Sequence, residues 1–168
     1  NLKSFSFSDV EAEITDVEIF NAENEPCAHV DQSDKIRIVV HCIAHADLTN
    51  LNLGLRIRNK EGVKIYSWGT LNQDISLRSG VKRDGEVFWE RSFSKGESFS
   101  VEFIFTCGLG PNLYEIQASI SEEGKPYYAE QRMIHWIDEA TFFTVTLEPQ
   151  TYHFGGVVDM GMVSQLTK

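Results

Sequence analysis

LNLGLRIRNKEGVKIYSWGT, residues 51–70, carries the clearest fold signal in this chain, because apolar and polar residues alternate on both sides of a short turn. A period of two is typical of β-strands with one buried face. The loop 60–62, with Gly62 at the position of positive φ, predicts a three-residue hairpin closure. Ile57 then pairs with Ile65, so the apolar faces of the two strands coincide. The stretch therefore predicts a β-hairpin.

The polar face of this hairpin is expected to present aromatic and basic side chains on the outside of a sheet. The same register places Trp68 opposite Gly54, and Tyr66 and Arg56 lie beside that indole ring. An exposed aromatic ring flanked by hydrogen-bond donors suits packing against a sugar ring. Simple packing is the other interpretation, since Trp and Tyr are common strand residues. Composition alone leaves both open.

Most of the remaining chain also alternates with a period of two, in short runs separated by Gly, Asn, Asp and Pro turns. These runs lie at 10–19, 36–43, 99–105, 114–120, 133–136 and 142–147, with a last stretch at 154–162. A slip in the alternation at Thr15–Asp16 predicts a β-bulge. No segment longer than a turn or two has helical periodicity, and the polar stretch 71–90 is expected to be an excursion before the strand at Phe99. The pattern predicts an all-β, antiparallel β-sandwich.

Composition limits the class of protein and of partner. A chain of 168 residues is most simply one domain, so we expect a single sandwich over residues 1–168. The net charge of −10 disfavours nucleic acid, anionic membranes and polyanionic ligands. Three cysteines, far apart, form no disulfide framework, which indicates a reducing compartment. Because the sequence starts without Met, we expect a fragment of a longer protein.

Catalytic and metal-binding signals are weak. The sequence has no nucleophile elbow, phosphate loop or dinucleotide fingerprint. His41 and His45 would lie about 13 Å apart on a strand, too far for one ion. Asp31 and Asp34 fit a turn more simply than a calcium site. We therefore expect a binding domain with no catalytic residues, no metal and no cofactor.

Tyr114 opens an alternating strand directly after the turn 109–113, and Ile116, Ala118 and Ile120 share its face. This pattern predicts a buried ring whose hydroxyl bonds to the backbone, as in the tyrosine corner of a sandwich.

The order of several short motifs resembles the C-terminal domain of the ATPase subunit in ABC transporters that export bacterial O-antigen polysaccharide (the Wzt type). The resemblance spans roughly Glu11 to Met162. Its motifs are Gly54–Ile57, Glu61–Gly62, Gly69–Thr70, Gly96–Glu97, Val101–Phe103, Leu109–Ile116, Asp138 with Ala140, Phe143–Val145 and Phe154–Val157. Two positions depart from it: the family often has Asn where this chain has Gly69, and Pro-Gly where it has Pro111–Leu113.

This resemblance implies an immunoglobulin-like fold and a cytoplasmic function at the inner membrane. The domain would bind a finished, terminally modified and lipid-linked O-polysaccharide and so give the exporter its substrate specificity. The ATPase activity would reside in a nucleotide-binding domain before Asn1, which would also link the domain to the transporter's membrane subunit. Family members form homodimers with exchanged C-terminal strands. The alternatives are a carbohydrate-binding module, a β-sandwich glycoside hydrolase domain, or a sandwich that binds only protein.

Combined with this implied function, the pattern nominates six carbohydrate-binding residues. Three form a polar stripe opposite the core face of the Tyr114 strand, and a solvated sheet surface explains that stripe equally well. Gln117 is the strongest candidate, because an amide both donates to and accepts from sugar hydroxyls. The full set is Gln117, Glu115, Ser119, Trp68, Tyr66 and Arg56.

At the C-terminus, Gly155–Gly156 is a flexible point before the apolar residues Val157, Val158, Met160 and Met162. This tail can fold back on its own sandwich or cross to a partner, because the same contacts serve both arrangements. The resemblance favours the exchanged dimer.

Overall fold

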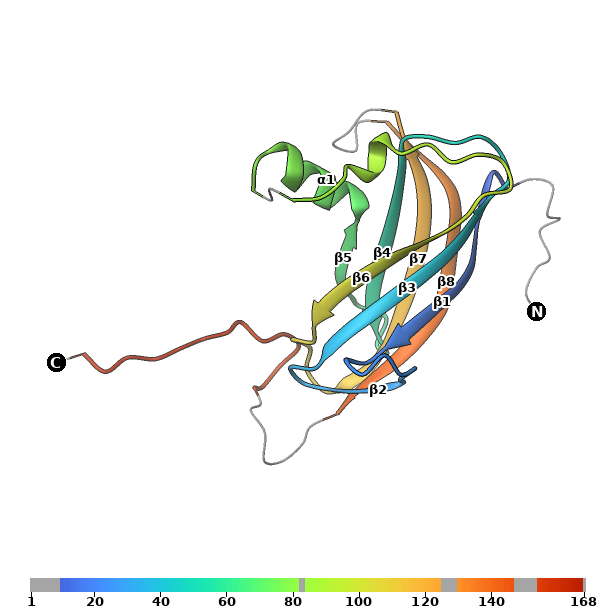
Figure 1. Cartoon of the computed structure of the whole chain (residues 1–168). Coiled ribbons are helices and arrows are strands. Elements are labelled where there is room, and N and C mark those ends of the chain that lie inside the picture. Colours follow the sequence, from blue (N-terminus) through green and yellow to red (C-terminus); the bar gives the residue numbers. More distant parts are fainter. Residues whose placement is uncertain (1–9, 82–83, 125–129, 147–153, 168) are drawn as a thin grey trace.

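The structure is a computed structural model that describes residues 10–81, 84–124, 130–146 and 154–167. Two β-sheets pack face to face (Figure 1). One sheet has the order β1-β3-β6, and the other has the order β2-β8-β7-β4-β5. The strands are β1 (Ala12–Phe20), β2 (His29–Asp31), β3 (Lys35–Ala44), β4 (Leu51–Asn59), β5 (Lys64–Gly69), β6 (Ser98–Thr106), β7 (Asn112–Glu123) and β8 (Gln131–Thr146). The predicted all-β, immunoglobulin-like sandwich is confirmed.

The strand pairing is antiparallel except between β2 and β8, which run parallel. The predicted bulge in the first strand is confirmed, because the register of β1 against β3 shifts between Ile14 and Asp16. The core lies between the sheets, where alternate residues of β1, β3, β4 and β7 are buried. Among the buried side chains are Ile38, Val40, Leu53, Ile116 and Phe143.

The hairpin at residues 51–70 forms, and its turn has the predicted positive φ at Gly62 (84°), but its register differs from the prediction. Arg58 pairs with Lys64 as expected, whereas Ile57 pairs with Tyr66. The register shift between these two pairs leaves Ile65 as an extra residue, packed against the core. The predicted pairing of Ile57 with Ile65 is therefore wrong, because β5 contains a bulge that adds one unpaired residue.

The bulge changes the face on which the hairpin aromatics lie. Trp68 pairs with Leu55 instead of Gly54, and Gly54 pairs with Gly69. Directly opposed residues share a face, so Trp68 lies on the side of the buried Leu55, toward the other sheet. The expectation that Trp68 lies over Gly54 on the outer face is wrong for this reason.

A short α-helix, α1 (Thr70–Arg78), and a 3-10 helix, η1 (Phe88–Glu90), lie in the excursion between β5 and β6. We did not predict a helix here, because α1 buries only Thr70, Leu71 and Asp74 and so has no apolar stripe. Its start is fixed by polar contacts: the Gly69 N–H donates to Asn72 Oδ1 (2.9 Å). Asp74 accepts from the backbone N–H groups of Phe88 (2.9 Å) and Trp89 (3.0 Å), which attaches α1 to η1.

The two predicted strands at 133–136 and 142–147 are one long strand, β8. Ala118 of β7 pairs with Ile137, and Ile116 pairs with Thr141. Three residues of β8, 138–140, therefore oppose the single residue Gln117, so this bulge contains two extra residues. Within it, Glu139 has a left-handed φ of 50°.

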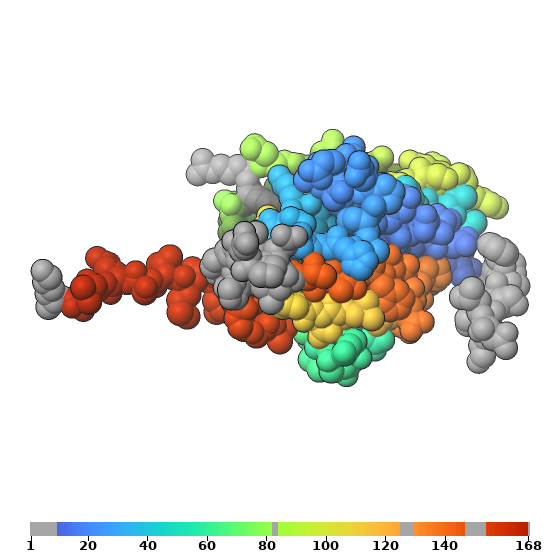
Figure 2. Space-filling view, turned by 90° about the horizontal axis from the view of Figure 1, so that it is seen from below, coloured from blue at the N-terminus to red at the C-terminus, as the bar shows by residue number. Residues whose placement is uncertain are grey.

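The last described segment, 154–167, meets the sandwich only briefly. Gly110 donates to the carbonyl of Val157 (2.8 Å), and Asp159 donates to that of Gly108 (2.7 Å). A Cβ atom at Gly110 would collide with the carbonyl oxygen of Gly156, so this approach requires glycine. Beyond residue 159 the chain runs away from the body of the molecule (Figures 1 and 2). The expected strand at 154–162 is thus reduced to one bridge between Leu109 and Val158. In the described part of the chain, no helix is long and apolar enough to span a bilayer.

Candidate functional site

The outer face of the five-stranded sheet carries two adjacent rows of side chains that we call the outer platform. In the first row, Gly54 of β4 pairs with Ser119 of β7, which pairs with Trp136 of β8. In the second row, Arg56 of β4 pairs with Gln117 of β7, which faces the β8 bulge that begins at Asp138. The outer platform is defined as Gly54, Arg56, Gln117, Ser119, Trp136 and Asp138.

Asp138 organises the outer platform. One of its oxygens, Oδ1, accepts from Gln117 Nε2 (2.6 Å) and from the indole Nε1 of Trp136 (2.8 Å). The guanidinium of Arg56 stacks over the same indole, 4.8 Å from its centroid. These contacts hold an aromatic ring, a guanidinium and a carboxylate in fixed relative positions before any ligand arrives, which lowers the entropy cost of binding.

The outer platform keeps unused hydrogen-bonding capacity. Gln117 is only 2% exposed, and its Oε1 is buried without a hydrogen-bond partner. Among the described residues, Asp138 Oδ2 and the Arg56 guanidinium have no hydrogen-bond partner either. At Gly54 an added Cβ atom would lie 3.1 Å from Ser119 Oγ, so the Ser119 hydroxyl packs closely over the glycine.

Glu115 lies beside the outer platform and fixes the β8 bulge. Its carboxylate accepts from Arg58 Nε (2.7 Å), forms an ion pair with Arg58 Nη2 (2.6 Å), and accepts from the backbone N–H of Glu139 (2.7 Å). The Glu115 side chain is 8% exposed and that of Arg58 is 37% exposed, so the carboxylate is shielded while the guanidinium reaches solvent. Glu115 therefore supports the backbone turn that aims Asp138 outward.

The six residues nominated from the sequence separate into three groups. Gln117, Ser119 and Arg56 lie together on the outer platform. Glu115 lies at its border in a structural ion pair. Trp68 and Tyr66 lie elsewhere, since the bulge at Ile65 turns them toward the three-stranded sheet, where the Trp68 ring contacts Phe103 edge-on (centroids 6.1 Å apart).

Trp136 and Asp138 were missing from the nominated set. Their spacing of two residues places them on one strand face, and this signal was visible in the sequence. The alternation of apolar and polar residues breaks at Glu139. The segments 133–136 and 142–147 therefore look like two separate strands in the sequence, although both belong to β8.

A second feature is a groove between the free edges of β5 and β6, with a volume of about 850 Å³. Its apolar wall includes Leu55, Ile57, Phe103, Phe105, Leu109 and Val158. Tyr66, which is 56% exposed, and Trp68 line it too. We call it the lateral groove.

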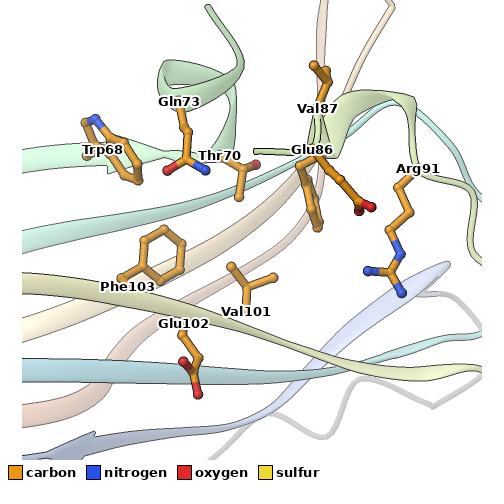
Figure 3. A pocket seen from close by; sticks show the side chains of 10 residues that line it. Trp68, Thr70, Gln73, Glu86, Val87, Arg91, Val101, Glu102 and Phe103 are labelled. Carbon is orange, nitrogen blue, oxygen red and sulfur yellow. The ribbon is translucent and has the colours of Figure 1, made fainter. Parts of the chain in front are cut away.

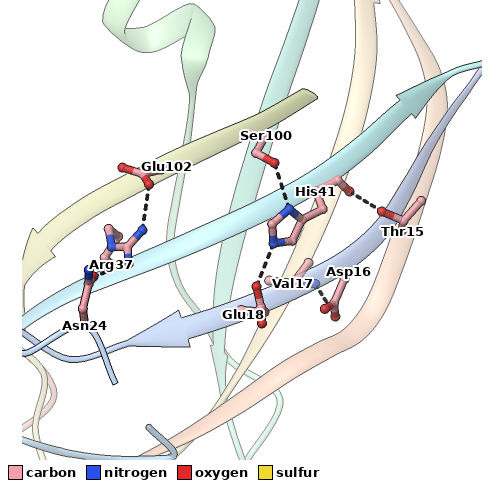
Figure 4. Close-up of polar contacts among 9 residues, drawn as sticks. All are labelled: Thr15, Asp16, Val17, Glu18, Asn24, Arg37, His41, Ser100 and Glu102. Carbon is pink, nitrogen blue, oxygen red and sulfur yellow. Dashed lines mark hydrogen bonds and ion pairs between the residues drawn. The ribbon is translucent and has the colours of Figure 1, made fainter. Parts of the chain in front are cut away.

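The outer face of the three-stranded sheet is occupied by cross-strand polar pairs (Figure 4). His41 bonds to Glu18 Oε2 (2.7 Å) and to Ser100 Oγ (2.8 Å), and so connects all three strands. Arg37 Nη1 donates to Glu102 (2.7 Å). Among the described residues, no group of three or more His, Cys, Asp or Glu side chains is arranged to hold a metal ion.

Comparisons with known proteins agree with this architecture. A sequence profile of the Wzt C-terminal domain matches residues 4–160. The crystal structure of the C-terminal domain of wzt superposes with a TM-score of 0.75 at 17% identity, covering 99% of this chain and 90% of that one. Among curated proteins, no sequence matches.

Two further solved structures match less well. A β-glucuronidase from glycoside hydrolase family 2 gives a TM-score of 0.47 at 11% identity, with 76% of this chain and 12% of that one covered. The CARDB domain of PF1109 from Pyrococcus furiosus gives a TM-score of 0.42 at 14% identity, covering 82% of this chain and 96% of that one. The profile match confirms the relationship indicated by the motif order: the chain belongs to the Wzt C-terminal domain family, the carbohydrate-binding part of O-antigen ABC transporters.

Proposed function

We propose that this domain binds O-antigen polysaccharide on the outer platform and thereby gives an exporter its substrate specificity. The observation that carries the proposal is the arrangement of Trp136, Arg56, Gln117 and Asp138, fixed by the two hydrogen bonds to Asp138 Oδ1. Sugar hydroxyls donate and accept at once, so a carboxylate oxygen beside a guanidinium matches them. The indole supplies an apolar surface for the C–H face of a sugar ring.

The electrostatics support an O-polysaccharide that is mainly neutral. The outer platform carries one positive and one negative side chain, Arg56 and Asp138, while the whole chain has a net charge of −10. A polyanion would be repelled by that field. The terminal modification of a finished chain is the feature that the domain would distinguish at this site.

The same geometry supports a binder over a glycoside hydrolase. Hydrolysis of a glycosidic bond uses two available carboxyl groups on opposite sides of the bond. Here Glu115 is committed to Arg58 and to the Glu139 N–H, and Asp138 holds Gln117 and Trp136. Transport would draw on ATP hydrolysed in a nucleotide-binding domain outside this chain.

The setting we propose is the cytoplasmic face of the inner membrane, with the domain attached through the rest of the protein to the transporter's membrane subunit. Three free cysteines support a reducing compartment. Burial raises the pKa of the Cys42 thiol to about 12, which keeps this cysteine unreactive.

We further propose a homodimer in which C-terminal segments are exchanged. Four apolar side chains of the projecting segment are largely in solvent: Met160 (79% exposed), Met162 (83%), Val163 (91%) and Leu166 (87%). The lateral groove begins at Val157 and Val158, where this segment leaves the body. A partner's tail in the groove would cover both apolar surfaces.

The binding proposal is tested by calorimetric titration of the domain with O-polysaccharide fragments, with and without the terminal modification. Asp138→Asn and Gln117→Ala should each weaken binding by about three- to tenfold, the effect of one or two hydrogen bonds. Ile104→Ala is the matched control, because Ile104 is 60% exposed on the outer face of the other sheet. Unchanged affinity in both platform variants would remove the outer platform from the site.

A further inference from the structure

A small pocket continues from the polar end of the lateral groove, between β6 and the segment that carries α1 and η1. Its volume is about 160 Å³, enough for roughly five water molecules or one sugar ring. Figure 3 shows Trp68, Thr70 and Gln73 on one side of this space and Phe103 and Val101 of β6 on the other. We call it the upper pocket.

The walls of the upper pocket combine aromatic surface with polar groups. The Trp68 and Phe103 rings meet edge-on, with their centroids 6.1 Å apart and an angle of 84° between their planes, so they form a corner. Glu86 and Arg91 stand at the opposite end (Figure 3), and among the described residues neither charged group has an ion-pair partner. An aromatic corner facing an amide, a carboxylate and a guanidinium can contact both the apolar and the hydroxyl-bearing sides of a pyranose ring.

The upper pocket is separate from the outer platform. Trp68 shares the inner side of the five-stranded sheet with Leu55, whereas Arg56 and Gln117 lie on the outer side. A ligand in the upper pocket therefore contacts none of the six residues of the outer platform. It would also leave the apolar part of the lateral groove available to a C-terminal segment.

From this geometry we propose that the upper pocket is a second saccharide site, which takes one neutral pyranose ring. The ligand class rests on the proposed function, while the site itself rests on its own geometry. The Trp68 face would receive the C–H side of the ring. Gln73, Glu86 and Arg91 would bond to its hydroxyls.

The three tryptophans of the chain allow the two sites to be tested separately by NMR. Trp68 borders the upper pocket, Trp136 belongs to the outer platform, and Trp89 donates to the carbonyl of Glu123 (2.8 Å), away from the outer platform. The probes are methyl pyranosides of glucose, galactose, mannose and N-acetylglucosamine, followed with ¹⁵N-labelled indole groups in the intact domain. At least one glycoside should shift the Trp68 indole resonance in a saturable way, while Trp89 serves as the reference.

Variants assign that shift to the upper pocket. Glu86→Gln and Gln73→Ala should each weaken the response of Trp68 by about three- to tenfold. Ser67→Ala is the matched control, because Ser67 is exposed, adjacent to Trp68 and on the opposite face of β5. Gln117→Ala should leave the Trp68 response unchanged, so loss of the outer platform site and loss of the upper pocket are distinguishable.

Two results would overturn the proposal. One is a Trp68 resonance that stays fixed at saturating concentrations of all four glycosides. The other is a shift of Trp68 that Glu86→Gln and Gln73→Ala leave unaltered. The titration is repeated after deletion of residues 160–168, because a partner's tail seated in the upper pocket would also hold the Trp68 resonance fixed. A Trp68 resonance that stays fixed in the truncated domain as well overturns the proposal.

Discussion

Tyr114 shows what a single residue pattern can specify in this chain. Its ring is 1% exposed, its hydroxyl donates to the carbonyl of Gly110 (2.5 Å), and it stacks on Phe143 with centroids 5.3 Å apart. The predicted corner is confirmed, because it depends only on the turn before the strand and on the apolar period after it. Burial also raises the pKa of the Tyr114 hydroxyl, so the group remains a donor across the physiological range.

Truncation of this ring should be among the most destabilising changes in the molecule. We expect Tyr114→Ala to lower the free energy of unfolding by about 3–5 kcal/mol through the cavity that it leaves. Tyr114→Phe keeps the packing and loses one hydrogen bond, a cost of about 1 kcal/mol. Urea titration followed by tryptophan fluorescence measures the free energy of unfolding of both variants. If the two variants lose the same free energy, the hydroxyl group, and not the packing of the ring, accounts for the stabilisation by Tyr114.

His135 gives the sandwich a pH dependence with a defined sign. Its Nδ1 accepts from the backbone N–H of Ile14 (2.9 Å) and so joins β8 to β1 of the other sheet. Burial lowers the pKa of His135 in the folded protein, partly offset by nearby Glu13. The folded state therefore binds a proton less readily than the unfolded chain, whose imidazole has a pKa of about 6.5.

This contribution to stability should be complete above about pH 6.5 and should decrease as the pH falls toward the lower pKa of the folded state. His135→Asn keeps an acceptor for the Ile14 N–H but cannot be protonated. Thermal unfolding of both proteins between pH 5 and pH 8 should give melting temperatures that converge at acidic pH. Parallel pH profiles would mean that His135 contributes nothing to the dependence.

At the scale of the elements, the strands and the bulge at Thr15–Asp16 could be predicted from the sequence, whereas the bulges in β5 and β8 could not. Alternation of period two marked β1, β3, β4, β6 and β7, because one face of each is buried. One extra residue shifts every later side chain to the other face, yet it leaves almost no trace in composition. The bulge at Ile65 moved Trp68 out of the expected site, and the irregularity at Glu139 concealed that Trp136 and Asp138 belong to a continuous strand beside β7.

The bulge in β8 should depend on Glu115. Glu115→Ala would leave Arg58 without its partner and the Glu139 N–H without its acceptor. We expect a loss of about 1–3 kcal/mol in the free energy of unfolding, since the Glu139 N–H loses its acceptor while the Arg58 guanidinium, which is 37% exposed, stays solvated. Glycan affinity should fall as well, because Asp138 loses its fixed position.

Glu139→Gly is the companion variant for this element. Glycine adopts the left-handed φ of 50° without the cost of about 1–2 kcal/mol that an L side chain incurs there. The variant should therefore be as stable as the parent protein or more so, with unchanged glycan affinity in the same titration. Marked destabilisation would show that the Glu139 side chain, and not only its backbone, fixes the bulge.

Over the whole molecule, the sandwich is closed on one side and open on the other. On the closed side, His135 and the ion pair between Arg132 and Glu11 (2.8 Å) join β8 to the β1 region. On the open side, the edges of β5 and β6 border the lateral groove. Chain order alone does not reveal which sheet edges remain free, so this groove could not be predicted from the sequence.

The exchanged dimer is the prediction that belongs to this scale. A projecting tail with Met160, Met162, Val163 and Leu166 in solvent would be unfavourable for a monomer, because each side chain loses the free energy of burial. Light scattering after gel filtration should find twice the mass of the 168-residue chain. Changing all four residues to Ser keeps the tail length and should shift the equilibrium toward monomer. Val81→Ser, at an exposed apolar residue on the α1–η1 connection (79% exposed), is the control and should remain dimeric. An intact domain that stays monomeric at high concentration would rule out the exchange and leave the tail to cover its own groove.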